Sequence, residues 1–268
     1  MPSTTGNSDT LYIRTGVQQF LFARYDHVKA TSLDFCKFPC RTGISANANM
    51  HDALRKVPLA HESYHQVNVS VTGDVTLVPL NEFDDEDAED LYFYNLPEGR
   101  NRKHVYFDML PRLNAMMLFA IDKDLEHTIL ETFPQATFHA AQMPLVLHWR
   151  SLAASGEGHI FVGWQEGRLT VCAFRNRELD LLNSYKVDNV GNALYYTLAL
   201  ARQWGIRPQE DHVWLCGEAG PCENLRGQLS TYLQHVAMLQ PAEEYSPHIV
   251  PYLKDITYDM LALLFRAY

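Results

Sequence analysis

The order of strand-like and helical segments occurs twice along this chain of 268 residues. Each half begins with a β-hairpin pattern and a third strand, and continues with alternating helical and strand-like segments. A repeat of this size constrains the fold more than any local motif, because both copies are expected to form the same structural unit. The sequence therefore predicts an α/β protein with two duplicated lobes, each a mixed sheet flanked by helices.

The first predicted lobe comprises residues 1–153, and its elements follow from apolar periodicity and from glycine and proline breaks. Pro134 ends a helix whose apolar residues Leu125, Ile129 and Phe133 share one face. Strands are predicted at 11–14, 20–24, 28–35, 67–71, 75–78, 105–110, 114–121 and 136–140, and helices at 46–57, 122–133 and 142–153.

The second predicted lobe comprises residues 154–268 and follows a linker at residues 155–158. A long helix is expected to begin at Asp188 or Asn189, since both are good N-cap residues, and to end at Trp204. Strands are predicted at 159–164, 168–174, 178–185, 213–217 and 236–239, and two further helices at 222–233 and 255–268.

Composition narrows the functional class. The formal net charge of -10 argues against a nucleic-acid-binding protein, which usually presents a basic face. Apolar runs are too short for a membrane span, and the polar first ten residues lack a secretory signal pattern. The five cysteines, an odd number in a chain of this size, predict free thiols and a cytoplasmic location.

The segment His61-Glu62-Ser63-Tyr64-His65 matches the H-E-x-x-H pattern of zinc proteases. That chemistry needs both imidazoles on one face of a helix. Pro58 precedes the segment closely and a strand pattern begins at Val67, so we expect an extended segment and no zinc. No P-loop, G-x-G-x-x-G or G-x-S-x-G motif occurs elsewhere.

The whole chain from residue 11 onward resembles an uncharacterised bacterial family, a domain of unknown function with an actin-like ATPase (ribonuclease H-like) fold. The opening L-Y-I-R-x-G motif (residues 11–16) carries this resemblance, together with Tyr64, residues 76–79 and the Phe133-Pro134 stop. Residues 116–153 and 159–220 also look like the type IV pilus inner-membrane actin-like protein. The resemblance implies the actin-like fold found in Hsp70 and the sugar kinases.

In this superfamily each lobe's hairpin carries a D-x-G turn, whose aspartates hold a hydrated Mg²⁺ and whose amides contact the ATP phosphates. The matching positions here are Arg14-Thr15-Gly16 and Gly163-Trp164-Gln165, so arginine and glycine replace the two aspartates. Glu218 stands where a glycine would let the backbone approach the nucleotide. The resemblance therefore implies a degenerate nucleotide cleft between the lobes, with no cofactor expected and weak binding of ATP with Mg as the alternative.

The candidate residues of this degenerate site combine the altered turns with nearby glycines. Amides at Gly16 and Gly167 remain possible anion sites. The Arg14 side chain has three open roles: neutralising a phosphate, pairing with Glu218 across the cleft, or lying exposed on its strand. The full set is Arg14, Thr15, Gly16, Gly163, Gln165, Gly167, Gly217 and Glu218.

Loss of one electrostatic catalytic element typically costs about 10²–10³ in rate, so loss of both metal-holding carboxylates predicts no phosphoryl transfer. The sequence favours a non-catalytic binding or scaffold module with an unidentified protein partner. One alternative is an atypical ATPase that recruits Asp26, Asp180 or Asp188. A second is a zinc hydrolase that uses His61 and His65.

Overall fold

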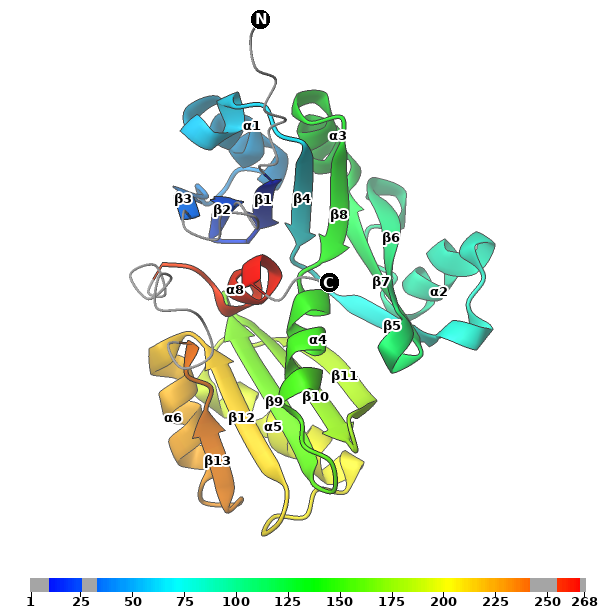
Figure 1. Ribbon diagram of the computed structural model, residues 1–268, viewed down its shortest axis with the longest axis vertical. Coiled ribbons are helices and arrows are strands. Elements are labelled where there is room, and N and C mark those ends of the chain that lie inside the picture. Colours follow the sequence, from blue (N-terminus) through cyan, green and yellow to red (C-terminus); the bar gives the residue numbers. More distant parts are fainter. Residues whose placement is uncertain (1–9, 26–32, 242–254, 266–268) are drawn as a thin grey trace, which may run out of the picture. The chain divides into compact units, whose positions relative to one another are not determined.

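A computed structural model describes residues 10–25, 33–241 and 255–265, which form two compact units (Figure 1). The first unit comprises Met1–Leu110 and Ala115–Ala141, and the second Pro111–Asn114 and Gln142–Tyr268. The sequence placed the lobe boundary after residue 153. The units divide at Ala141 instead because helix α4 (Gln142–Leu152) packs on α8 (Tyr258–Phe265) and on β10 (Arg168–Arg175).

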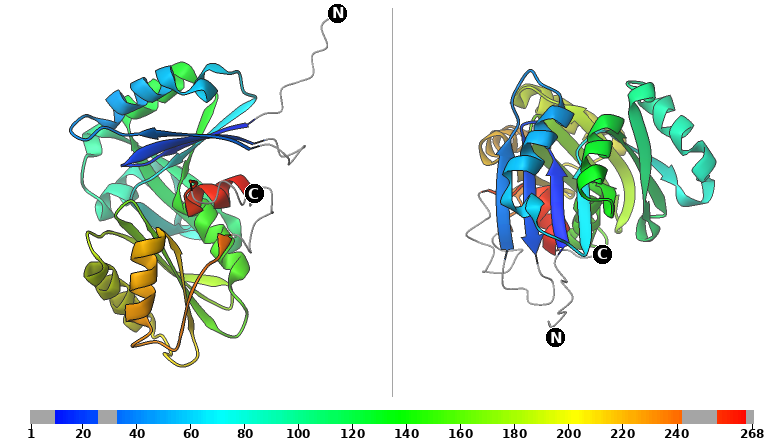
Figure 2. Two further views of the ribbon diagram at one scale, coloured as in Figure 1. Left: turned by 90° about the vertical axis from the view of Figure 1, so that its left-hand side faces the viewer. Right: turned by 90° about the horizontal axis from the view of Figure 1, so that it is seen from above.

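The main sheet of the first unit has the strand order β3-β2-β1-β4-β8. Neighbouring strands are antiparallel from β3 to β1 and parallel from β1 to β8. Helices α1 and α3 pack together over one face of this sheet (Figure 2). The elements are β1 (Thr10–Thr15), β2 (Gln19–Tyr25), β3 (Leu33–Pro39), α1 (Ala46–Lys56), β4 (Gln66–Val71), α3 (Lys123–Thr132) and β8 (Ala136–Ala140).

The sheet of the second unit repeats this topology in the order β11-β10-β9-β12-β13. Its pairs are again antiparallel from β11 to β9 and parallel from β9 to β13. The predicted duplication is therefore confirmed at the level of strand order and direction. The remaining elements are β9 (Gly158–Gln165), β11 (Glu178–Lys186), α5 (Val190–Trp204), β12 (His212–Gly217), α6 (Ala219–Leu229) and β13 (His235–Met238).

The first unit also contains a small sheet that the repeat does not predict. Its strand order is β5-β7-β6, all antiparallel, and its core packs on helix α2. Strand β5 follows β4 after three residues yet pairs with β7, so these two strands belong to different sheets. The elements are β5 (Val75–Pro79), α2 (Ala88–Asn95), β6 (Lys103–Leu110) and β7 (Ala115–Asp122), with 3-10 turns η1 (Pro58–His61), η2 (Leu80–Glu82), η3 (Asp85–Asp87), η4 (Arg100–Arg102) and η5 (Pro111–Leu113).

Some predicted boundaries differ from the observed ones. Residues 28–32 of the third predicted strand and 266–268 of the closing helix lie outside the described residues. The helix predicted at 222–233 spans Ala219–Leu229 instead, so it begins and ends earlier than expected. None of the helices in the described part of the chain is long and apolar enough to cross a membrane.

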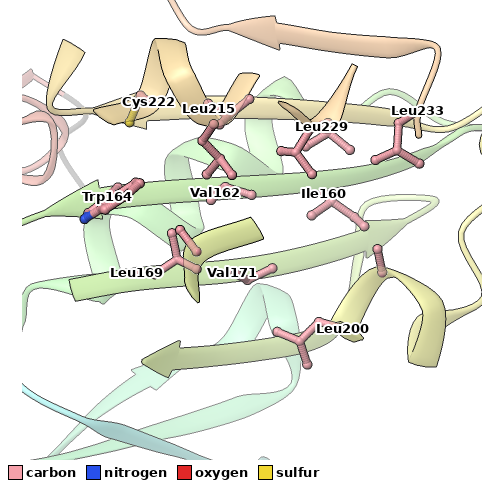
Figure 3. Close-up of a cluster of buried hydrophobic side chains, with 14 of the residues drawn as sticks. Ile160, Val162, Trp164, Leu169, Val171, Leu200, Leu215, Cys222, Leu229 and Leu233 are labelled. Atoms are coloured by element: carbon pink, nitrogen blue, oxygen red, sulfur yellow. The ribbon is translucent and has the colours of Figure 1, made fainter. Parts of the chain in front are cut away.

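An apolar core holds α5 and α6 against the second sheet (Figure 3). Val162 and Leu215 lie on adjacent parallel strands and are fully buried. Leu200 and Leu225 contribute from the two helices. Because a buried leucine or valine side chain contributes about 1.5–3 kcal/mol, this cluster supplies much of the stability of the second unit.

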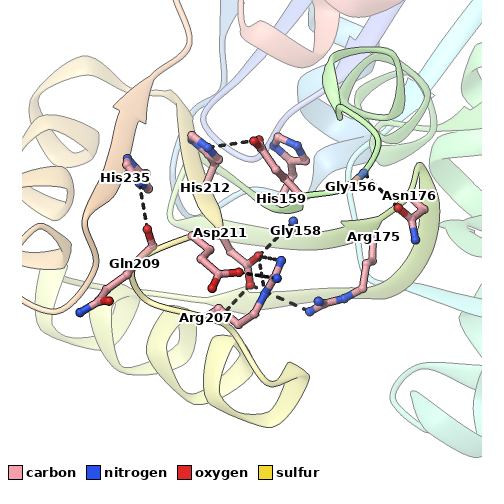
Figure 4. A network of polar contacts seen from close by, with 12 residues as sticks. Gly156, Gly158, His159, Arg175, Asn176, Arg207, Gln209, Asp211, His212 and His235 are labelled. Carbon is pink, nitrogen blue, oxygen red and sulfur yellow. Dashed lines mark hydrogen bonds and ion pairs between the residues drawn. The ribbon is translucent and has the colours of Figure 1, made fainter.

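The buried carboxylate of Asp211 lies at the end of the second sheet where β9 and β12 begin (Figure 4). Asp211 has no exposed surface. It accepts hydrogen bonds from the backbone N–H of Gly158 at 3.0 Å and of Arg207 at 2.8 Å, and from Arg207 Nη2 at 2.5 Å. Arg175 Nη2 adds an ion pair at 4.0 Å. Burial alone would raise the pKa of Asp211, but the hydrogen bonds from Arg207 and Gly158 outweigh it and lower that pKa below its ordinary value.

Candidate functional site

The β9–β10 turn and the start of α6 meet at one end of the second sheet. Glu166 and Gly167 both have positive φ, 50° and 71°, as a two-residue hairpin requires. The backbone N–H of Glu166 donates to Glu218 Oε1 at 2.7 Å, and the N–H of Glu218 donates to the carbonyl O of Trp164 at 2.9 Å. The structure therefore brings together the candidate residues Gln165, Gly167 and Glu218. The hydrogen bond of the turn amide is already accepted by a carboxylate of the chain itself.

Gly217 leads from β12 into α6 through a conformation that only glycine tolerates. Its φ is 117°, and a Cβ atom there would lie 2.0 Å from the carbonyl O of Trp164. One turn later Cys222 donates its thiol hydrogen to the carbonyl O of Cys216 at 3.3 Å. Burial, and secondly the charge of Glu218, raise the pKa of the Cys222 thiol to about 12. This thiol therefore stays protonated near neutral pH, and all five cysteines are free as predicted.

Gly163 lies within β9, away from the turn. A Cβ at this position would be 3.2 Å from the ring of Trp149, whose indole stacks on Phe161 with ring centroids 5.6 Å apart. The glycine therefore makes room for a buried tryptophan. An aspartate here would have to displace that ring, so packing disfavours a larger side chain at this position.

The candidate residues of the first unit lie at the end of β1. The Thr15 hydroxyl donates to the carbonyl O of Ser70 at 3.3 Å and accepts from the N–H of Thr72 at 3.4 Å, so it is engaged with the end of β4. Gly16 follows directly and is buried. Arg14 is only 3% exposed, so the interpretation of it as an exposed strand residue is wrong.

The structure also adds residues that the sequence patterns did not indicate. Arg14, Ser70 and His139 are register partners on β1, β4 and β8, so their side chains share one face of the sheet. His139 Nδ1 lies 2.7 Å from Asp108 Oδ1, and the other oxygen of Asp108 accepts from the N–H of Ala140 at 2.8 Å. These residues are far apart in sequence and match no motif, so only the sheet register reveals the row.

The three aspartates considered as replacement metal ligands are not equivalent. Asp26 lies outside the described residues. Asp180 accepts a hydrogen bond from Trp204 Nε1 at 2.9 Å and is engaged there. Asp188 directly follows the residue whose N–H donates to the carbonyl O of Gly167, so it is the candidate that lies near the β9–β10 turn.

The H-E-x-x-H segment is not a helix. His61 ends η1, where its Nε2 donates to the carbonyl O of Arg55 at 3.2 Å, and His65 directly precedes β4. An extended path was expected from His65 to Val71, and it is confirmed for Gln66–Val71, which form β4. Glu62 forms an ion pair with Arg24. Among the residues that the structure describes, no three His, Cys, Asp or Glu side chains are grouped so as to hold a metal ion.

We expect purified protein to contain no stoichiometric zinc, because the two imidazoles do not share a helical face. Elemental analysis after purification without chelators provides the measurement. One zinc per chain, lost in His65→Ala and kept in a His127→Ala control, would contradict the expectation; His127 is exposed on α3 beside Glu131.

Comparison with known proteins places the chain in a family. Residues 3–236 match the model of a family described as a protein of unknown function (DUF3822). The protein belongs to the DUF3822 family. A search of curated proteins gives no match for this DUF3822 protein.

Two solved structures identify the fold of the DUF3822 chain. A Bacteroides thetaiotaomicron VPI-5482 protein with an actin-like ATPase fold and unknown function matches with a TM-score of 0.87 and 23% identity, covering 98% of both chains. The PilM–PilN type IV pilus biogenesis complex matches with a TM-score of 0.57 and 12% identity, covering 96% of this chain and 97% of the other. The DUF3822 protein therefore has the actin-like ATPase fold, and both resemblances drawn from the sequence are confirmed.

Proposed function

We propose that this DUF3822 protein is a non-catalytic actin-like module that binds a protein partner in the cytoplasm. One observation carries the proposal: the Glu218 carboxylate accepts from the Glu166 amide at 2.7 Å. The superfamily resemblance assigns phosphate contacts to such turn amides. In this chain the amide already has an anionic partner from the protein.

Electrostatics strengthens this reasoning. A phosphate oxygen about 4 Å from the Glu218 carboxylate would be repelled by about 1 kcal/mol in a water-like medium and about 4 kcal/mol at the effective dielectric near a protein surface. A divalent metal normally offsets such repulsion. Arg14 and Gly163 stand at the two positions that hold the metal in the superfamily, and neither side chain can ligate one.

A protein partner is favoured over a small ligand by the comparison with the pilus protein. PilM shares the fold and occurs in a complex with PilN. The net charge of -10 also disfavours nucleic acid as the partner of this chain. Its five free thiols fit a reducing compartment.

Phosphate release from millimolar Mg·ATP tests the non-catalytic part of the proposal. We expect no release above the buffer rate from the wild-type protein or from Glu218→Gln, because phosphoryl transfer depends on metal and electrostatic positioning. Turnover that disappears in Asp188→Asn and persists in Asp180→Asn would instead support the atypical ATPase, since of these two residues Asp188 is the one near the turn.

A further inference from the structure

Residues 153–157, which join α4 to β9, are held in place by side chains from elsewhere in the second unit (Figure 4). The N–H of Gly156 donates to Oδ1 of Asn176, in the β10–β11 turn, at 3.0 Å. The N–H of Ala154 lies 3.1 Å from Nε2 of His159 on β9 and donates to it. The path of this short connection therefore depends on the hydrogen bonds that these two side chains accept.

Both ring nitrogens of His159 face N–H donors. In addition to the Ala154 amide at Nε2, the indole Nε1 of Trp214 on β12 lies 3.2 Å from Nδ1. A neutral imidazole has one lone pair and accepts from one of these donors, whereas an imidazolium carries a hydrogen on both nitrogens and accepts from neither. His159 is only 3% exposed, so water does not replace a lost hydrogen bond. The geometry of the site therefore favours the neutral ring.

His159 also belongs to a row of three histidines on the adjacent strands β9, β12 and β13. His212 is the register partner of both His159 and His235. Its ring stacks on that of His159 with centroids 5.5 Å apart, and on that of His235 with centroids 4.7 Å apart. A proton on His212 places a positive charge against the His159 ring and opposes a second charge there.

The carboxylates near His159 act in the opposite direction. Glu157 and Asp211 both favour a proton on the ring, but burial is the largest influence and the charge of His212 the next. Together these two lower the pKa of His159 below its ordinary value of 6.5. The titratable and charged side chains around the ring and the connecting residues are those of Glu157, Arg175, Arg177, Arg207, Asp211, His212 and His235.

We propose that His159 is a pH-sensitive switch, whose neutral ring holds residues 153–157 beside β9 and whose protonation in mild acid releases them. A proton is disfavoured on the ring in its folded surroundings, so acid favours conformations in which the ring reaches water and the Ala154 amide is free. The stabilisation of the connection is therefore complete above the ordinary pKa of 6.5 and declines as the pH falls below that value.

A second contact of the same connection has the opposite sign. Oε2 of Glu157 lies 3.3 Å from Nε2 of His212, and a proton on His212 strengthens this pair. Release of the connection by acid therefore points to His159 and not to His212. The inference goes beyond the proposed partner-binding function and does not depend on it.

Hydrogen–deuterium exchange of the full chain at about pH 7.5 and about pH 5.5 tests the switch, with rates corrected for the intrinsic pH dependence of amide exchange. In the wild type the opening constant of residues 153–157 should rise several-fold in acid, up to the limit of about tenfold that one proton sets over this range. His159→Gln keeps an acceptor for the Ala154 N–H and does not titrate, so its rise should be less than about twofold. The control His127→Gln changes an exposed histidine of α3 in the first unit and should respond as the wild type does.

A second variant, Trp214→Phe, leaves the buried histidine in place. It removes the donor that faces Nδ1, so the ring can hold a proton there and the acid response should be smaller than that of the wild type. Opening of residues 153–157 that does not change with pH in the wild type would overturn the inference. A response in His159→Gln or Trp214→Phe equal to that of the wild type would also overturn it. None of these results bears on nucleotide binding, which tests the proposed function separately.

Discussion

Replacing Gly217 by alanine is expected to lower the free energy of unfolding of the second unit by about 3–4 kcal/mol. A side chain at a φ of 117° is strained, and its Cβ would lie 2.0 Å from the carbonyl O of Trp164. Relief of that overlap has to displace β9 from β12, which also weakens the hydrogen bond from the Glu218 N–H to the same oxygen. The cost therefore combines backbone strain with a lost hydrogen bond.

Urea unfolding followed by tryptophan fluorescence measures this effect directly. All four tryptophans lie between residues 149 and 214, so the signal reports the second unit. Gly227→Ala is the control, because Gly227 lies in α6 with open space around its Cα. That variant should gain about 0.5–1 kcal/mol. Equal stability of Gly217→Ala and wild type would show that the described turn is wrong.

Asp211→Ala is expected to destabilise the second unit by about 3 kcal/mol. The backbone N–H groups of Gly158 and Arg207 would lose their acceptor at a position with no exposed surface. The guanidinium of Arg207 is partly exposed and can be rehydrated, so the two backbone groups carry most of the cost. Glu210→Ala, which removes only the exposed partner of Arg207, should cost less than about 0.5 kcal/mol.

The same carboxylate predicts a pH dependence with a definite sign. Because the pKa of Asp211 is lower in the folded protein than its ordinary value of 3.8, the contribution of its carboxylate to stability is present above pH 3.8. This contribution is lost as the pH falls further, through the pKa that Asp211 has in the folded protein. The stability difference between wild type and Asp211→Asn should therefore be constant near neutral pH and narrow below about pH 4. A difference that widens with acid would contradict the assigned hydrogen bonds.

Periodicity predicted most strands and helices because each depends on local patterns. The hairpin of β9 and β10 follows from two alternating runs around Glu166 and Gly167, and α5 from its cap and apolar stripe. The pattern says nothing about which sheet a strand joins. The separation of β5 from β4 was therefore not predictable, since it depends on pairing with β7, some 40 residues away in sequence.

The candidate site was predictable in its members but not in its contacts. Resemblance indicated Glu218 and the turn glycines, whereas the bond from the Glu166 amide joins residues 52 positions apart and follows from the fold alone. Arg14 was assigned an exposed position as one of three options because arginine usually reaches solvent, yet it is buried beside Ser70. The pairing of His139 with Asp108 likewise depends on two sheets meeting, which no local pattern records.

Calorimetric titration with Mg·ATP at about millimolar concentration tests the central claim most directly, because it measures affinity without requiring turnover. We expect no saturable binding by the wild-type protein, since the Glu218 carboxylate already accepts the hydrogen bond of the Glu166 amide. In addition, Arg14 and Gly163 provide no metal ligand. Glu218→Gln, which removes the charge and keeps an acceptor, should bind only weakly if at all. Micromolar binding by the wild type that is lost in Arg14→Ala would contradict the account and show that the nucleotide site is functional.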